Sequence, residues 1–584
     1  MRSQSTSFST LSQIKIQRRP LPEQILSSNG MSQTIANILS TRGITDQAQI
    51  DYSLKRLLPP HDLSHIGEAA ELLADALTAG ANIVFVGDFD ADGATSCALG
   101  LRCMKSFGHD QVSYLVPNRF EFGYGLSPEI VGVAAMQQPD VIVTVDNGIS
   151  SVDGVYAAQQ LGMSVLITDH HLPGETLPTA EVIVNPNLPG DRFASKNLAG
   201  VGVIFYVMLA LRARLRELGW FAAQGIPEPN MTQFLDLVAL GTVADVVPLD
   251  QNNRLLVQQG MQRIRQGQAC AGIQALLTVA KRNAASLAAS DLGFAVGPRL
   301  NAAGRLDDMS VGIECLLTDN VDKAMLLALQ LDELNRERRV VEQGMQEDAL
   351  AIVESISLDQ AEQPAMYILH DDSWHQGVVG LVASRIKERT NRPVLALAPG
   401  DNEGEWKGSA RSVEGVHVRD LLARLESLHP GLMLKFGGHA MAAGLSLDNK
   451  KMPEFTTALM AVAEEFTREQ DWQQIVWTDG ALQTEEFSIE FAEQLRALTP
   501  WGQTFPEPMF EGEFQVVESR VVGDTHAKLR LQPSNSAMVL DAICFGYLRD
   551  HEALPEGQIT AVFRLDVNEF RERKSVQLMI EHIE

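Results

Sequence analysis

Between residues 81 and 200 of this chain, short apolar runs alternate with helical or loop-like segments. The five runs predicted as strands are 82–86, 112–117, 141–145, 164–168 and 182–185. Continuous apolar runs, without alternation of polar residues, are typical of strands that are buried on both faces. The pattern therefore predicts an α/β fold with a parallel sheet covered by helices on both sides.

Charged residues directly follow three of these strands. In chain order they are Asp88, Asp90 and Asp92, then Asp146, then Asp169, His170 and His171. A single Asp after a strand is often only a helix N-cap. Because the carboxyl ends of parallel strands meet at one edge of the sheet, three such groups indicate a shared site there. An EF-hand is excluded because Leu99, not Glu, occupies position 12 of a loop that begins at Asp88.

A further carboxylate, Asp245, lies in the apolar stretch LGTVADVVPL and needs a partner there. Several buried carboxylates repel one another, and divalent cations remove that cost. Oxygen donors with only two imidazoles favour Mn²⁺ or Mg²⁺ over a structural zinc site. Six carboxylates exceed what one ion needs, so we expect two ions and metal-assisted phosphoester hydrolysis.

Other segments could bind phosphate. The segment 407–412 (KGSARS) combines cations, hydroxyls and glycine, and 436–444 (FGGHAMAAG) is rich in small residues. Arg299 and Arg305 lie in a Gly/Pro-rich segment that reads as a loop, and could be phosphate clamps or solvated surface. Arg119 and Tyr124 could pair a phosphate and stack a base. From the residues alone, ordinary turns and loop positions remain open alternatives.

The ordered set GDFDADGATS, VDNGIS, TDHH and ADVVPL resembles the successive motifs of the DHH phosphoesterase superfamily. GSARS and FGGHAMAAG are similar to its companion C-terminal module, DHHA1. With GPRLNAAGRL and the β-rich C-terminal region, the chain from about residue 66 onward resembles the single-strand-specific 5′→3′ exonucleases of that superfamily. The resemblance implies release of 5′-mononucleotides from single-stranded DNA, in recombination and repair.

The resemblance also implies roles for individual residues. The implied metal ligands are Asp88, Asp90, Asp92, Asp146, His170 and Asp245. Among these, Asp146 resembles the ligand that bridges the two ions; His171 would lie near the scissile phosphate, and Asp169 would orient its loop without binding metal. The resemblance further assigns the 5′-terminal phosphate to Arg119, Ser409 and Arg411, and other phosphate contacts to Arg305 and His439.

Changes in composition and in the pattern of apolar residues along the chain predict five parts. They are an N-terminal arm with short helices (1–60), the DHH catalytic domain (61–320), a connector helix (321–356), the DHHA1 domain (357–470) and an OB-like nucleic-acid-binding β-barrel (471–584). Two alternatives remain within this organisation: a DHH phosphoesterase acting on short oligonucleotides or cyclic dinucleotides, and a non-catalytic DHH scaffold. The extra β-domain counts against the first alternative, and the complete set of ligands counts against the second.

Charge and targeting signals constrain the partners. The chain carries 47 Lys and Arg against 74 Asp and Glu, a net charge of −27, which disfavours non-specific adhesion to nucleic acid. Residues 471–584 hold 20 acidic and 9 basic residues, net −11, so binding there must depend on a few placed cations such as Arg564 and Lys574.

The chain shows no secretory or membrane-spanning segment, and we expect a cytoplasmic monomer. The resemblance implies cooperation with single-strand-binding protein and a RecQ-type helicase.

Overall fold

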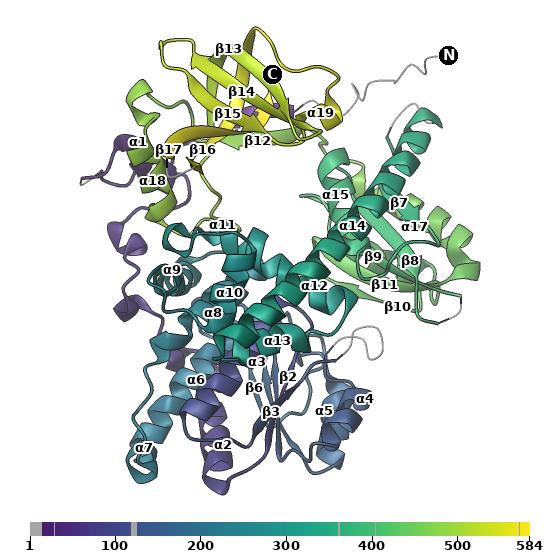
Figure 1. Ribbon diagram of the computed structural model, residues 1–584. Coiled ribbons are helices and arrows are strands. Elements are labelled where there is room, and N and C mark those ends of the chain that lie inside the picture. The colour runs from purple at the N-terminus through teal and green to yellow at the C-terminus, as the bar shows by residue number, and fades with distance from the viewer. Residues whose placement is uncertain (1–13, 29, 118–124, 360–362, 403, 571–572) are drawn as a thin grey trace. The chain divides into compact units, whose positions relative to one another are not determined.

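The computed structural model describes residues 14–28, 30–117, 125–359, 363–402, 404–570 and 573–584 (Figure 1). The chain divides into two compact units. The first comprises residues 1–18, 336–478 and 546–554, and the second comprises residues 19–335, 479–545 and 555–584. The domain boundaries expected from the sequence are not the same division and stay a prediction. No helix in the described ranges is long and apolar enough to span a bilayer.

The second unit contains the predicted parallel sheet, in the order β3-β2-β4-β5-β6 with every pair parallel. Its strands are β2 (Ile83–Gly87), β3 (Val112–Leu115), β4 (Val141–Val145), β5 (Ser164–Thr168) and β6 (Val182–Val184). Every residue of β2 and β4 is buried, as the unbroken apolar runs predict. The α/β fold class is therefore confirmed.

Helices cover both faces of this sheet (Figure 1). On one side lie α2 (Ile66–Ala79) and α6 (Gly200–Glu217), and on the other lie α4 (Pro128–Ala135) and α5 (Val152–Gln160). The buried side chains of α4 and α5 form one apolar cluster with Val84, Ile142 and Val165 of the strands. Both faces are thus closed to water, and the polar edge at the strand ends is left as the place for a site.

Further helices complete the core of the second unit. They are α1 (Gln33–Ser40), α3 (Ala91–Ser106), α7 (Trp220–Gln224), α8 (Leu235–Ala244), α9 (Gln251–Arg265), α10 (Ala271–Val279), α11 (Ala289–Asp291), α12 (Gly297–Leu306) and α13 (Ser310–Leu317). A π-helical turn, η6 (Leu292–Val296), joins α11 to α12. The long helix α14 (Val321–Asp359) follows. The segment expected to be a Gly/Pro-rich loop is the helix α12, because its proline lies in the first turn, where no backbone donor is lost.

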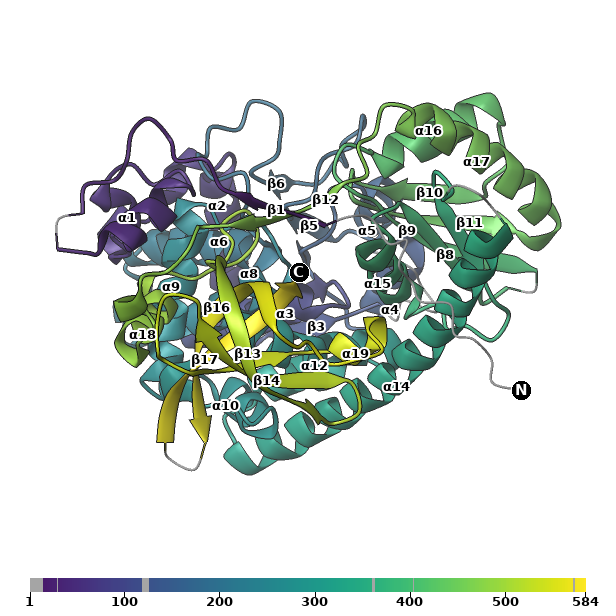
Figure 2. The same cartoon turned by 90° about the horizontal axis from the view of Figure 1, so that it is seen from above.

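The C-terminal strands of the second unit form a closed barrel in the order β13-β14-β15-β17-β16 (Figure 2). They are β13 (Phe510–Val522), β14 (His526–Pro533), β15 (Leu540–Cys544), β16 (Gln558–Phe570) and β17 (Arg573–Ile583). All pairs are antiparallel except β15 with β17. The helix α18 (Ile489–Leu498) packs on β16 and β17. The expectation of a small C-terminal β-barrel is confirmed.

The first unit contains a mixed sheet in the order β10-β11-β9-β8-β7. Its strands are β7 (Tyr367–His370), β8 (Val394–Pro399), β9 (Glu405–Arg411), β10 (Lys435–Gly438) and β11 (Ala442–Asp448), and only β7 and β8 are parallel. Its helices are α15 (Val379–Thr390), α16 (Val418–Leu428), α17 (Met452–Thr467) and α19 (Tyr547–Asp550). The N-terminal strand β1 (Ile14–Arg18) pairs in parallel with β12 (Gln474–Thr478), which the sequence did not indicate.

A buried ion pair ties the N-terminal region to the entry of the barrel within the second unit. The Arg42 guanidinium donates to both carboxylate oxygens of Asp479, at 2.7 and 2.9 Å, and both side chains are at most 2% exposed. Arg42 Nε also donates to the Pro506 carbonyl, and the Asp479 carboxylate accepts from Met509 N–H. Such a pair stabilises the fold only while both partners are present.

We predict that Asp479→Ala lowers the free energy of unfolding by about 3 kcal/mol, because it leaves a buried guanidinium without its carboxylate. Urea unfolding followed by circular dichroism measures the change. The matched control is Asp51→Ala, which removes an exposed partner of Arg56 at 3.3 Å and should cost less than about 1 kcal/mol. Equal effects of the two substitutions would contradict the structural role of the buried pair.

Candidate metal centre

The first group of acidic residues lies in the turn between β2 and α3. Asp90 is the N-cap of α3, and its Oδ1 accepts from the backbone N–H groups of Asp92 and Gly93, each at 3.0 Å. Asp88 and Asp92 are buried at 6% and 0% exposure. The cap thus fixes a sharp turn that holds three carboxylates within five residues at the end of a buried strand.

Asp92 is held by the N-terminus of a second helix. Its two carboxylate oxygens accept from the backbone N–H groups of Gly200 (2.6 Å) and Val201 (2.9 Å), in the first turn of α6. Burial, reinforced by the Asp245 carboxylate, raises the pKa of Asp92 to about 8. The side chain is therefore rigidly placed, while each oxygen keeps a further lone pair for another ligand.

Asp146 follows β4 in a conformation that costs energy. Its φ is +62°, in the left-handed region that is unfavourable for most residues other than glycine and asparagine. A Cβ on Gly200 would lie 2.5 Å from the Asp146 Cβ, so only glycine fits opposite it. Burial, together with the carboxylates of Asp92 and Asp90, raises the pKa of Asp146 well above its ordinary value. A strained, buried carboxylate facing other carboxylates indicates a functional position.

Asp169 organises the loop after β5. Its Oδ1 accepts from the backbone N–H groups of His170 (2.7 Å) and His171 (3.1 Å) and lies 2.7 Å from His171 Nδ1; its Oδ2 accepts from Ile149 N–H. Burial is the largest single effect and would raise the pKa of Asp169, but the hydrogen bond to His171, the charges of the two histidines and the Ile149 N–H together outweigh it, and the pKa is lowered. Both carboxylate oxygens of Asp169 are therefore engaged in hydrogen bonds that hold the loop, which agrees with the orienting role expected for Asp169.

The two histidines differ in charge. Burial, together with the neighbouring His171, lowers the pKa of His170, which favours the neutral imidazole that binds metal. Burial is the largest single effect and opposes protonation of His171, but the hydrogen bond to Asp169 and the charges of nearby carboxylates together outweigh it and raise the pKa of His171 to about 9. At neutral pH, His171 is therefore a cation beside a cluster of carboxylates.

Two asparagines that sequence reasoning missed hold the histidine backbone. Asn187 Nδ2 donates to the His170 carbonyl at 2.6 Å, and Asn185 Nδ2 donates to the His171 carbonyl at 2.9 Å. Both follow β6, so their only sequence signal is polar residues after a fourth strand of the same sheet. They fix the loop from the neighbouring strand end.

Asp245 brings the sixth carboxylate from α8, which ends at this residue. His170 Nε2 lies 3.5 Å from Asp245 Oδ2 and 3.0 Å from Asp146 Oδ1. Burial, with the Asp90 carboxylate as the next cause, raises the pKa of Asp245 to about 7. His170 Nε2 and Asp245 Oδ2 are buried and make no hydrogen bond within the described part of the chain.

The structure brings the predicted ligands, and with them His171, into three groups; within each group the donor atoms lie within 4.8 Å of one another. The groups are Asp88, Asp90 and Asp146; Asp92, His170 and Asp245; and Asp146, His170 and His171. Carboxylate oxygens with one or two imidazoles match the ligands that Mn²⁺ and Mg²⁺ accept. Buried donor atoms without hydrogen bonds to described residues, such as His170 Nε2 and Asp245 Oδ2, are suited to bind a cation. The residues therefore fit divalent cations.

Helix α12 braces the first motif. Asn301 Oδ1 accepts from Ala91 N–H at 2.7 Å, and a Cβ on Gly304 would lie 1.7 Å from the Phe89 carbonyl oxygen. Arg305 follows in the same helix. Arg299 is buried and donates to Asp332 at 2.9 Å and to the Ala295 carbonyl at 2.5 Å, which favours a structural role. Phosphate binding by Arg299 and Arg305 stays a prediction.

Three further predicted phosphate-binding residues, Ser409, Arg411 and His439, lie in the first unit. Arg411, at the end of β9, donates from Nη1 to Ser409 Oγ at 2.7 Å and to the Ala410 carbonyl at 2.9 Å. Burial lowers the pKa of Arg411, and no carboxylate pairs with it among the described residues. His439 is exposed in the turn between β10 and β11. Arg119 and Tyr124 lie outside the described residues.

We predict that the metal-free protein loses stability as the pH rises from about 5 to 8. The buried Asp92 and Asp245 have folded pKa values of about 8 and 7, far above their unfolded value of 3.8. The folded state therefore binds more protons in this window, and deprotonation favours unfolding. Thermal unfolding in EDTA measures the effect, and excess Mn²⁺ should reverse it. An Asp92→Asn variant whose pH dependence equals that of the wild type would contradict this account.

Known protein families match three parts of the chain. The DHH family N-terminal domain matches residues 82–242, the DHHA1 domain matches residues 361–468, and the RecJ OB domain matches residues 478–582. The three matches come in the order expected from the motifs and together cover most of the chain.

Individual relatives match over nearly the full length. The chain is 52% identical to the single-stranded-DNA-specific exonuclease RecJ of Dickeya dadantii, over 97% of this chain and 99% of the relative. It is 50% identical to that of Escherichia coli, over 98% and 99%. The crystal structure of RecJ in complex with Mn²⁺ from Thermus thermophilus superposes with a TM-score of 0.80 at 30% identity, covering 98% of this chain and 79% of that chain. On these matches, the chain belongs to the RecJ family.

Proposed function

We propose that this chain is a metal-dependent, single-stranded-DNA-specific 5′→3′ exonuclease that releases 5′-mononucleotides. The observation that carries the proposal is the pair of donor groups that share no residue, Asp88–Asp90–Asp146 and Asp92–His170–Asp245. Two separate sets of oxygen-rich donors at one sheet edge support two cation sites side by side, and Asp146 recurs in the third group that overlaps both. Two cations in one site suit in-line displacement at a phosphodiester.

Membership of the RecJ family supports the proposed substrate and the proposed metal cofactor. The named relatives are single-stranded-DNA-specific exonucleases, and Thermus thermophilus RecJ is known with Mn²⁺ and with Mg²⁺. When bound, Mn²⁺ or Mg²⁺ would supply an activated water and neutralise charge on the diester oxygens. The chain's own residues place the donors, exclude bulk water by burial, and hold His171 as a cation.

His171 is suited to act on the substrate itself. Its side chain is 32% exposed, whereas Asp169, which holds it, is only 1% exposed. With a pKa of about 9 it carries a proton at neutral pH, so it can donate to an anionic diester oxygen or to the leaving group. Asp169 holds the His171 ring in a fixed orientation through its contact with His171 Nδ1, and so acts as a positioning residue.

The 5′ direction requires a group that recognises the terminal phosphate. Arg411 Nε and Nη2 have no hydrogen-bond partner among the described residues, and Ser409 Oγ lies beside Nη1. A guanidinium with free donors and no carboxylate suits a phosphate, which it binds through two oxygens. We assign the 5′-phosphate to Arg411, Ser409 and Arg119. Arg305 and His439 are proposed as other phosphate contacts, and Tyr124 as a residue that stacks a base.

The proposed biological setting rests on family membership alone. An exonuclease of this specificity would act in DNA recombination and repair, in the cytoplasm, where its DNA substrate lies. Single-strand-binding protein and a RecQ-type helicase are the partners we expect, because they expose and cover single strands. Co-purification from cells would test these associations directly.

We predict that Asp146→Asn lowers the turnover number by more than about a hundredfold, which exceeds the usual loss from a supporting residue. Asparagine tolerates the left-handed backbone at this position, so the fold should persist. The assay follows single-stranded oligonucleotides labelled at either end, in Mn²⁺ or Mg²⁺, with duplex as a control. Asp153→Asn, an exposed carboxylate in the first turn of α5, is the matched control. Wild-type turnover by Asp146→Asn would exclude the proposed metal site.

We further predict that Arg411→Gln raises the KM for 5′-phosphorylated single strands by about tenfold, the value of one charge-assisted hydrogen bond. The variant should also treat 5′-phosphorylated and 5′-hydroxyl strands alike. Lys407→Gln, on the same strand but already paired with Asp401 at 2.5 Å, is the control. If the variant still preferred the 5′-phosphate as strongly as the wild type, residues other than Arg411 would have to recognise the phosphate.

A further inference from the structure

A basic cleft lies in the second unit, and none of the residues of the candidate metal centre lines it. Its volume is about 630 Å³, and it is lined by the end of α9, the segment after α10, helix α18 and strands β16 and β17. Its charged residues are the cations Arg265, Lys281, Arg282, Arg496 and Lys574 and the anions Asp291, Glu493 and Glu569. A cationic excess is unexpected on a chain with a net charge of −27.

Only part of this positive charge is neutralised. Arg282 pairs with Asp291 at 3.4 Å, and Lys574 pairs with Glu493 at 2.6 Å. Within the described part of the chain, Lys281 and Arg496 form no ion pair. These two cations are therefore available to an anion from outside the protein.

Arg265 faces Arg496 across the cleft. Its Nε and Nη2 donate to the Leu287 carbonyl at 2.9 and 2.6 Å, which fixes the guanidinium in place. Burial, followed by the nearby Arg496, lowers the pKa of Arg265, and Asp291 offsets this only in part. Two guanidinium groups that repel each other, with only partial compensation from Asp291, form a site that an anion would stabilise.

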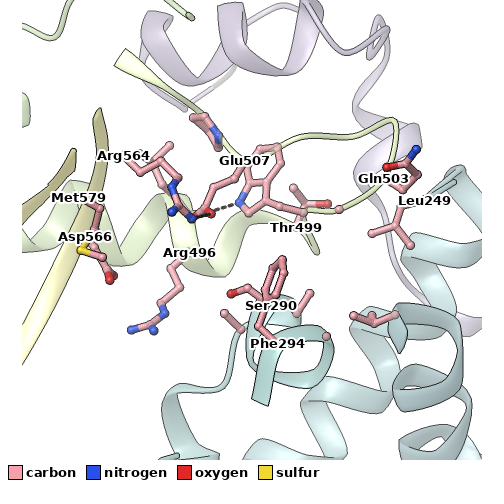
Figure 3. A pocket seen from close by; sticks show the side chains of 18 of the residues that line it. Leu249, Ser290, Phe294, Arg496, Thr499, Gln503, Glu507, Arg564, Asp566 and Met579 are labelled. Atoms are coloured by element: carbon pink, nitrogen blue, oxygen red, sulfur yellow. Dashed lines mark hydrogen bonds and ion pairs between the residues drawn. The ribbon is translucent and has the colours of Figure 1, made fainter. Parts of the chain in front are cut away.

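Arg496 also lines an apolar cavity, shown in Figure 3, which therefore adjoins the cleft. Its volume is about 390 Å³, and its lining includes Leu249, Phe294, Trp501 and Met579. The Phe294 side chain, from η6, is 80% exposed. An exposed aromatic ring that shares a cavity with a guanidinium outside any ion pair is a combination that can stack a base and hold its phosphate.

We propose that the cleft and the cavity together form a second binding site for single-stranded nucleic acid, with backbone phosphates at Arg265, Lys281 and Arg496 and a base against Phe294. The inference rests on the proposed function, because the substrate strand supplies both groups at once. In a duplex the bases are stacked inside and cannot enter the cavity, so the site favours single strands. Long strands would thus be gripped at a point separate from the metal centre.

The first test measures binding in EDTA, where the strand is not cleaved. The probe is a fluorescent oligothymidylate, and the variants are Lys281→Gln with Arg496→Gln, and Phe294→Ala. Loss of two phosphate contacts should lower the slope of log affinity against log salt by about 1.4, from about 0.7 per contact. Phe294→Ala should weaken binding about tenfold without changing the slope. Arg216→Gln, an exposed residue of α6 paired with Glu228, is the control and should change neither.

A second measurement separates this site from the metal centre. In Mn²⁺, the double variant should raise the KM for long strands about tenfold, with kcat and the KM for a very short oligonucleotide unchanged. Unchanged binding and KM in a double variant that degrades DNA normally would overturn the second site. Selective loss of affinity for a polyglutamate peptide, with DNA binding unchanged, would also overturn it and assign the cleft to an acidic protein. Failure of the wild type to bind or degrade single strands would instead overturn the proposed function.

Discussion

Crowding of negative charge at one edge of a buried sheet is the constraint on which the structure depends. Asp92, Asp146 and Asp245 each have a raised pKa, first because of burial and then because of carboxylates next to them. No fold would gather these groups for stability alone, since each buried charge costs several kcal/mol. The arrangement is reasonable only if positive charge is brought in, and the donor types select divalent cations that prefer oxygen.

The rest of the unit can be understood as a frame for that cluster. The N-terminus of α6 supplies two N–H groups to Asp92, and Gly200 leaves room for Asp146. Asn185 and Asn187 hold the backbone of the histidine loop from β6, and α12 braces the first motif through Asn301. Three separate segments thus fix the donors before any ion binds, which keeps the reorganisation on binding small.

Much of this architecture could be predicted because it depends on local signals. The apolar runs predicted strands β4 and β5 with the bounds that the structure shows, and the acidic residues after these strands predicted the position of the site. The missed features depend on distant partners. Strand β1 exists through pairing with β12, about 460 residues away in sequence. Asn185 and Asn187 look like turn residues until the neighbouring loop is placed, and Arg265 and Arg496 meet only in the folded chain.

The cations available for binding nucleic acid in the structure differ from those expected from the sequence. The terminal cations Arg564 and Lys574, expected to contact the strand, are paired with Glu507 and Glu493. Among the described residues of the cleft, Lys281, in the turn after α10, and Arg496, in α18, form no ion pair, and both lie outside the barrel strands. Attraction for nucleic acid in this acidic protein thus depends on where cations lack carboxylates rather than on the number of cations.

The central claim is that the carboxylate cluster is held ready for divalent cations and is partly protonated without them. Calorimetric titration of Mn²⁺ into the metal-free protein at pH 7, in buffers of different ionisation enthalpy, measures both ion stoichiometry and proton release. The account predicts two ions per chain and a net release of protons, because Asp92, Asp146 and Asp245 must be ionised to bind. A cluster that binds no Mn²⁺, or that binds it without releasing protons, would contradict the account.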